Sequence, residues 1–121
     1  MSAKVRDLDV TRKILRELDE VDAFLHGVPE EAFLSSPLLQ KAVVMSLINI
    51  GELSKAYTAA FFAATPHIPW QGIRSARNVA AHTYEAIDML DVYETYRQDL
   101  PALRAALDKE LRRLETAARQ K

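Results

Sequence analysis

Hydrophobic positions along this chain recur at intervals of three and four residues, and no stretch alternates with the period of two that is typical of β-strands. This spacing predicts a first helix over residues 5–25, with charged side chains on its outer face. Apolar residues cover almost all faces of residues 37–64, so we expect this stretch to form the longest and most central helix. The inward stripe of the first helix consists of Ile14, Leu18, Val21 and Leu25.

Prolines and capping residues predict where the helices begin and end. Ser36-Pro37 is typical of an N-cap followed by proline at the first helical position. Asp88 is a candidate N-cap for a helix that runs to about Asp99. Pro101 should then break or kink the chain, because proline lacks an N–H and its ring clashes with the preceding turn. The shorter predicted helices span residues 70–82, 88–99 and 102 onward, the last with Leu103, Leu107, Leu111 and Leu114 facing inward.

These elements predict an all-α protein, an antiparallel helical bundle of four to five helices with short connections. The length of 121 residues indicates one domain, residues 1–121, which is large enough to bury a core without disulfides or metals.

Charge and composition narrow the possible functions. The 16 basic and 17 acidic residues give a formal net charge of -1, so any nucleic acid must be held by a local patch rather than by the field of the whole protein. The chain has no cysteine, which excludes disulfides and fits a reducing compartment. Neither a signal sequence nor an uninterrupted membrane-spanning stretch is recognisable. We therefore expect a cytoplasmic protein with no membrane partner.

The predicted helix over residues 70–82 differs from the other predicted helices because several polar side chains gather on it. Arg74, Asn78 and His82 share one helical face, and Arg77 and Tyr84 lie on the adjoining stripe. A guanidinium matches a phosphate, so Arg77 is a candidate anion-binding group. His82 could act as general base or acid, because imidazole exchanges its proton near neutral pH.

Other candidates are weaker. We expect Trp70 to belong to the core, and His26 and His67 to be structural or solvated. Glu52 and Lys55 form either a solvated pair or part of the cleft beside Arg77. Three separated histidines without cysteine give no zinc spacing, there is no acidic cluster for magnesium, and there is no glycine-rich phosphate loop. No metal or cofactor is therefore expected.

An ordered series of motifs resembles the HepT-type HEPN ribonuclease toxins. The family's catalytic motif, arginine followed four to six residues later by histidine, falls on Arg77 and His82, with a tyrosine two places further on at Tyr84. Ala76, Thr83 and Glu85 depart from the residues that are common in this family. The likeness extends from about residue 38 to about residue 103, and its other motifs are Ile50-Gly51-Glu52, Ile68-Pro69-Trp70, Ile87-Asp88 and Asp99-Leu100-Pro101.

The resemblance implies a HEPN-like fold and a metal-independent endoribonuclease toxin. Arg77 and His82 would then be catalytic at the cleft of a homodimer, with Asn78 and Arg74 in supporting or substrate-binding roles. It also implies a minimal nucleotidyltransferase antitoxin as partner, which attaches AMP to Tyr84 and silences the toxin. Alternatively, Tyr84 merely closes the helix end. The chain could also be a catalytically inactive module that binds nucleotide or protein, or a purely structural dimerisation bundle.

Overall fold

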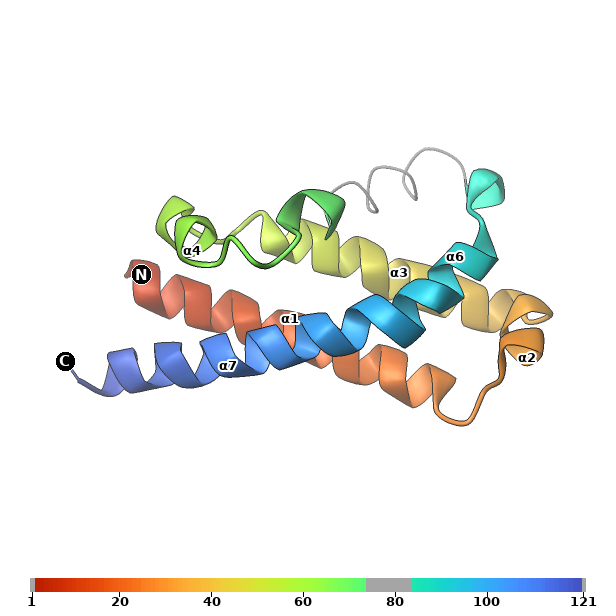
Figure 1. Ribbon diagram of the computed structural model, residues 1–121, viewed down its shortest axis with the longest axis horizontal. Coiled ribbons are helices and arrows are strands. Elements are labelled where there is room, and N and C mark those ends of the chain that lie inside the picture. Colours follow the sequence, from red (N-terminus) through yellow and green to blue (C-terminus); the bar gives the residue numbers. More distant parts are fainter. Residues whose placement is uncertain (1, 74–83, 121) are drawn as a thin grey trace.

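The computed structural model of the protein is an all-α bundle, and it describes residues 2–73 and 84–120 (Figure 1). The prediction of the fold class is confirmed: every regular element in these two ranges is helical, with no β-strand among them. The elements are α1 (Ala3–Leu25), α2 (Glu30–Leu34), α3 (Pro37–Ser54), α4 (Ala59–Ala64), η1 (Tyr84–Ala86), α6 (Met89–Glu94), η2 (Thr95–Asp99) and α7 (Leu100–Arg119).

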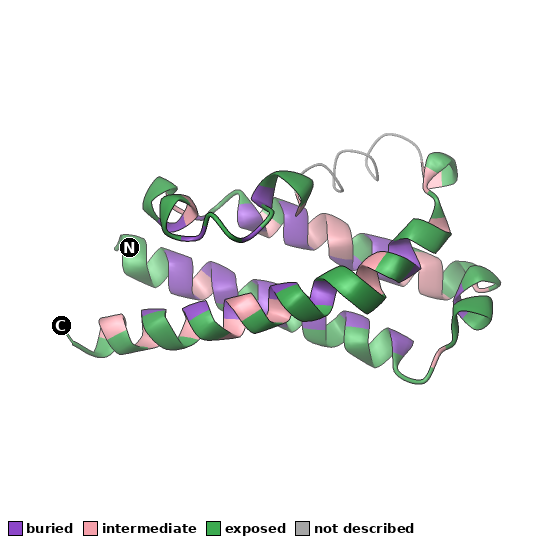
Figure 2. Ribbon diagram, viewed as in Figure 1, coloured by how far each residue is buried: buried purple, intermediate pink, exposed green. Residues whose placement is uncertain are grey.

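Three long helices form the body of the bundle. Helix α1 packs against both α3 and α7, and both of these run antiparallel to it, so that the two ends of the chain lie at the same end of the molecule (Figure 1). The buried residues follow the inward faces of the three helices (Figure 2). Ile14 and Val21 of α1, Val43 of α3 and Leu107 of α7 are completely buried. The predicted inward stripes of α1 and α7 therefore lie in the core, except that Leu111 is only partly buried and packs against it.

Capping residues set the helix starts as the sequence predicts. The hydroxyl of Ser36 accepts a hydrogen bond from the Leu39 backbone N–H at 3.2 Å, and Pro37 occupies the first turn of α3. The Asp88 carboxylate accepts one from the Leu90 N–H at 2.9 Å at the start of α6. Both predicted N-caps are confirmed.

The prediction of one helix over residues 37–64 is wrong. Helix α3 ends at Ser54, and α4 begins at Ala59. Between them Tyr57 is buried, and its hydroxyl is hydrogen-bonded to that of Thr11 in α1 at 2.7 Å. Thr58 caps α4, and its hydroxyl and backbone N–H also bond to α1. These tertiary contacts end the helix at a place where the local sequence contains neither proline nor glycine.

The predicted break at Pro101 is also absent. Helices α6 and α7 are joined by η2, a π-helical turn in which the Leu100 N–H donates to the Thr95 carbonyl. Pro101 lies in the first turn of α7. Within a regular helix a proline ring clashes with the carbonyl four residues earlier, and the wider π turn gives the ring room. The chain therefore remains helical from α6 through α7.

Within the described ranges, no helix combines the length and the apolar character that crossing a membrane requires.

Candidate functional site

Four of the five predicted site residues, Arg74, Arg77, Asn78 and His82, lie outside the described residues. Tyr84 lies within them, at the start of η1. The structure thus describes the chain on both sides of residues 74–83, which we call the predicted catalytic segment, and residues 70–73 immediately before it form a helical turn.

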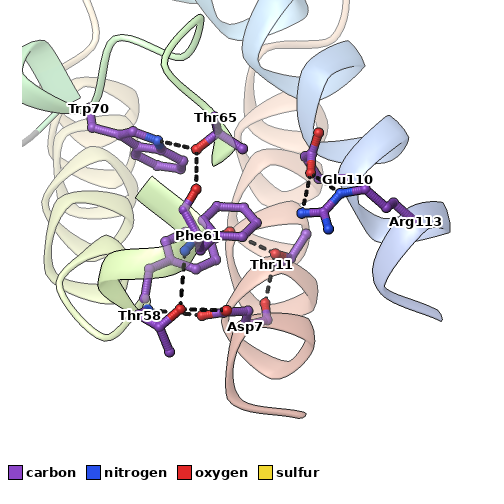
Figure 3. Close-up of polar contacts among 9 residues, drawn as sticks. Asp7, Thr11, Thr58, Phe61, Thr65, Trp70, Glu110 and Arg113 are labelled. Carbon is purple, nitrogen blue, oxygen red and sulfur yellow. Dashed lines mark hydrogen bonds and ion pairs between the residues drawn. The ribbon is translucent and has the colours of Figure 1, made fainter. Parts of the chain in front are cut away.

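The upstream anchor of the segment is Trp70, whose side chain is only 6% exposed, so the prediction that it belongs to the core is confirmed. Its indole Nε1 donates a hydrogen bond to the Thr65 hydroxyl at 2.9 Å (Figure 3). The Thr65 hydroxyl in turn donates to the Phe61 carbonyl at 2.8 Å, in the last turns of α4. Trp70, which precedes the predicted catalytic segment, is therefore connected to α4 through Thr65, and each buried donor in this series has an acceptor.

An aromatic cluster surrounds this anchor. Tyr57 and Phe61 stack with their ring centroids 4.0 Å apart. The Trp70 ring lies 5.1 Å from Tyr57, 5.6 Å from Phe62 and 6.0 Å from Phe61 in tilted or edge-on arrangements. Such geometries are favourable for aromatic pairs, beyond the area that they bury. The cluster fixes the position of the indole.

A buried polar layer connects the cluster to α1. The Asp7 carboxylate accepts hydrogen bonds from both the backbone N–H and the hydroxyl of Thr58 (Figure 3). The Thr11 hydroxyl is hydrogen-bonded to Tyr57 Oη and also donates to the Asp7 carbonyl at 2.8 Å. Burial raises the pKa of Tyr57 far above that of a free phenol, so its hydroxyl stays neutral and is a structural group.

The downstream anchor is Tyr84. Its side chain is half-buried, and its phenol oxygen is buried with no hydrogen-bond partner. The Ile87 N–H donates to the Tyr84 carbonyl at 3.1 Å, which closes the turn expected after the predicted catalytic segment. The Lys41 ammonium nitrogen lies 5.9 Å from the centroid of the Tyr84 ring, at the outer limit of a cation–π contact.

Sequence reasoning did not identify Lys41. It is an exposed residue of α3, and α3 was predicted only from its apolar positions. Lys41 and Tyr84 are far apart along the chain, and no periodic pattern relates them. Only the packing of η1 beside α3 brings the two side chains together.

A groove of about 670 Å³ opens between α3, α6 and α7 and the loop that leads to Trp70. Its floor is apolar, with Val44, Leu47 and Leu103 among the lining residues. Carboxylates of α6 and η2 also line it. Ile73, just before the predicted catalytic segment, and Ile87, four residues after it, both line the groove.

The remaining candidates are exposed residues, and the alternative that Glu52 and Lys55 lie near Arg77 stays a prediction because Arg77 is outside the described residues. His26 and His67 are exposed, as expected, and His67 borders the groove. The Lys55 ammonium pairs with the Glu52 carboxylate at 3.6 Å, and both side chains are about half exposed. Within residues 2–73 and 84–120, no three histidine or acidic side chains cluster so that they could hold a metal ion.

Comparison with known proteins places this architecture in context. The family model described as Ribonuclease HepT-like matches residues 14–110. A protein named "Probable ribonuclease HepT" of Thermococcus cleftensis is 29% identical over 101 residues, which cover 84% of this chain and 92% of that protein. A candidate RNase of Methanocaldococcus jannaschii is 28% identical over 84% of each chain. One of Caldanaerobacter subterraneus is 30% identical over 74% of this chain and 80% of its own length. No solved structure matches significantly.

Proposed function

Because the chain belongs to the Ribonuclease HepT-like family, we propose that it is a metal-independent endoribonuclease and the toxin of a toxin-antitoxin pair. The observation that carries the proposal is that the family match over residues 14–110 includes the Arg77 and His82 motif. A histidine beside a permanent cation suits phosphodiester cleavage, since one group moves a proton and the other holds the phosphate.

The proposed reaction uses the 2′-hydroxyl of the RNA as nucleophile. His82 takes part in proton transfer as the 2′-oxygen bonds to phosphorus. Arg77 stabilises the negative charge on the pentavalent phosphorus, and Asn78 and Arg74 contact the substrate. The bond from phosphorus to the 5′-oxygen then breaks, and that oxygen leaves with a proton. The products are a 2′,3′-cyclic phosphate and a free 5′-hydroxyl.

The active form in this proposal is a homodimer, in which two copies of the catalytic segment line one shared cleft. One Arg77 and one His82 make a sparse site for this chemistry, and a two-fold axis doubles it. Large apolar side chains on the surface support self-association. Leu38 is 79% exposed and Met45 is 56% exposed, and the two lie on the same face of α3, about two turns apart.

Control of the toxin in this proposal depends on Tyr84 and a minimal nucleotidyltransferase partner. The Tyr84 oxygen attacks the α-phosphorus of ATP, the bond from that phosphorus to the β-phosphate oxygen breaks, and pyrophosphate leaves. The phenol proton passes to a base of the partner or to solvent. The attached AMP adds a bulky base and a negative charge that competes with RNA phosphate for the cationic groups of the site.

The decisive experiment is a cleavage assay on total RNA in the presence of a metal chelator. We expect wild type to cut, and His82→Ala to lose about 10²–10⁴-fold in rate, the usual contribution of general acid–base catalysis. His26→Ala is the matched control, because it removes an exposed histidine that lies outside both the motif and the groove. A substrate with 2′-deoxyribose at the scissile position should resist cleavage.

Failure of wild type to cut any RNA would leave the catalytically inactive binding module as the better description. Equal activity of wild type and His82→Ala would refute the assignment of the histidine. Circular dichroism of each variant separates loss of chemistry from loss of fold.

A further inference from the structure

The contact between Lys41 and Tyr84 joins a phenol oxygen without a hydrogen-bond partner and an ammonium without an ion pair in the described part of the chain. The phenol oxygen is buried without a hydrogen-bond partner. The Lys41 ammonium faces the ring of Tyr84, and within the described part of the chain it forms no ion pair. A cation over a phenol ring at 5.9 Å is held weakly compared with one that is paired with an anion.

The described neighbours of Lys41 in α3 carry no negative charge that would pair with its ammonium. Gln40, its neighbour in α3, uses its amide to donate to the Phe33 and Leu34 carbonyls, both at 3.0 Å, so it does not compete for an anion. Leu38 and Met45 lie on the same side of α3 and are apolar. The nearest acidic residue along the chain from Tyr84 is Glu85, which is exposed on η1.

We propose that Lys41 is the cation that binds the phosphate attached to the Tyr84 oxygen in the silenced protein. The inference rests on the proposed modification of Tyr84 and adds the residue that stabilises its product. An AMP ester has one negative charge on its phosphate, and Lys41 offers three N–H donors. Modification thereby replaces a weak contact with the ring by a charge-assisted hydrogen bond. Lys41 is a positioning residue here and has no part in bond making.

The pairing also explains how AMP could block the site from the side of α3. A phosphate that is held by Lys41 fixes the direction in which the attached nucleoside leaves Tyr84. The nucleoside then stays next to the catalytic segment, because Tyr84 follows that segment directly in the chain. Without Lys41 the same adduct would move more freely and would inhibit less.

The test uses a phosphate at the Tyr84 oxygen that does not require the partner enzyme. Phosphotyrosine is introduced at position 84 of the full chain, and the second phosphate pKa is measured by ³¹P NMR titration. An adjacent cation favours the dianion, so we expect the pKa to be lower by about half a unit or more with Lys41 than in Lys41→Met. Glu85 is present in both proteins and cancels in the comparison.

Two further variants complete the design. Lys109→Met removes an exposed lysine of α7 and should leave the phosphate pKa unchanged. Lys41→Arg keeps the charge and should restore the lowered value. Equal phosphate pKa values for the Lys41 protein and for Lys41→Met would overturn the inference. Absence of an AMP adduct on wild type, measured separately by intact mass, would count against the proposed modification and would not affect the titration result.

Discussion

The carboxylate of Asp7 accepts two hydrogen bonds from Thr58, one from the backbone N–H at 2.9 Å and one from the hydroxyl at 2.7 Å. Asp7 belongs to α1, and Thr58 is the N-cap of α4. The Thr58 hydroxyl also accepts a hydrogen bond from the Phe61 N–H at 3.2 Å. One buried carboxylate thus determines where α4 begins. Phe61 of α4 accepts a hydrogen bond from Thr65, which accepts one from Trp70, so Asp7 is also connected to the residue that precedes the predicted catalytic segment.

Removal of this carboxylate should destabilise the fold. We expect Asp7→Ala to lower the free energy of unfolding by about 1.5–3 kcal/mol, because hydrogen bonds to a charged acceptor are lost and the Thr58 donors lose their partner. Urea denaturation measures the loss. Asp9→Ala is the control: its carboxylate is 47% exposed in an ion pair with Lys13, and such pairs contribute less than about 1 kcal/mol. Equal losses in the two variants would contradict this role of Asp7.

The hydrogen bond between Trp70 and Thr65 should appear as a coupling energy. Thr65→Val leaves the indole N–H buried and unpaired, which costs about 1–3 kcal/mol, whereas in Trp70→Phe that donor is already gone. A double-mutant cycle should therefore give a coupling of about 1 kcal/mol. Thr65→Val combined with Tyr93→Phe, whose hydroxyl bonds instead to the Val28 carbonyl, should be additive. A cycle without coupling would show that this bond contributes nothing to stability.

Alkaline pH should destabilise the protein through Tyr57. Burial raises its pKa above the ordinary value of 10.0, and the hydrogen bond between Tyr57 and Thr11 only partly opposes this. Because the pKa is higher in the folded state, neutral Tyr57 makes its full contribution to the free energy of unfolding below about pH 10. This contribution is lost as pH rises further. Tyr57→Phe should show a smaller alkaline loss in urea unfolding at several pH values. At neutral pH the free energy of unfolding of Tyr57→Phe should be lower by about 1 kcal/mol, because the hydrogen bond between Tyr57 and Thr11 is lost.

For this experiment Tyr93→Phe is the matched control, since it removes a different phenol and keeps Tyr57. It should retain the wild-type decline above pH 10. An identical decline in Tyr57→Phe would assign the alkaline transition to other groups.

Charges on the exposed apolar face of α3 should separate the proposed dimer. We expect wild type to be a dimer by light scattering at micromolar concentration, and Leu38→Glu combined with Met45→Glu to be a monomer with little RNA cleavage. Val5→Glu, at an exposed apolar position of α1, should stay dimeric. A wild-type monomer that cleaves RNA would refute the shared cleft.

Modification should depend on the Tyr84 oxygen. Incubation with the partner nucleotidyltransferase and ATP should add AMP mass to wild type and abolish RNA cleavage, whereas Tyr84→Phe should stay unmodified and active. Tyr96→Phe, in η2, is the control and should behave as wild type. If Tyr84→Phe is neutralised as well as wild type and no adduct forms, inhibition is by binding alone.

The parts of the fold that were predictable are those decided by interactions between residues close together in the sequence. Ser36 and Asp88 were recognisable as N-caps because a cap bonds to an N–H two or three residues away. The Arg77, His82 and Tyr84 motif was identified from spacing and family resemblance, and its role stays a prediction. The end of α3 and the continuity of the chain past Pro101 were predicted wrongly, because bonds from α1 and a widened turn decided them.

The sequence by itself determined that this is a helical protein with a ribonuclease-like motif between predicted apolar helices. Helical periodicity and motif spacing are properties of neighbouring residues. Only the tertiary structure decided which distant side chains support that motif. Asp7 reaches Thr58, and Lys41 reaches Tyr84, across gaps that no local pattern encodes. The physical reason is that burial and packing choose these partners, and packing depends on how whole helices dock rather than on the residues next to each one.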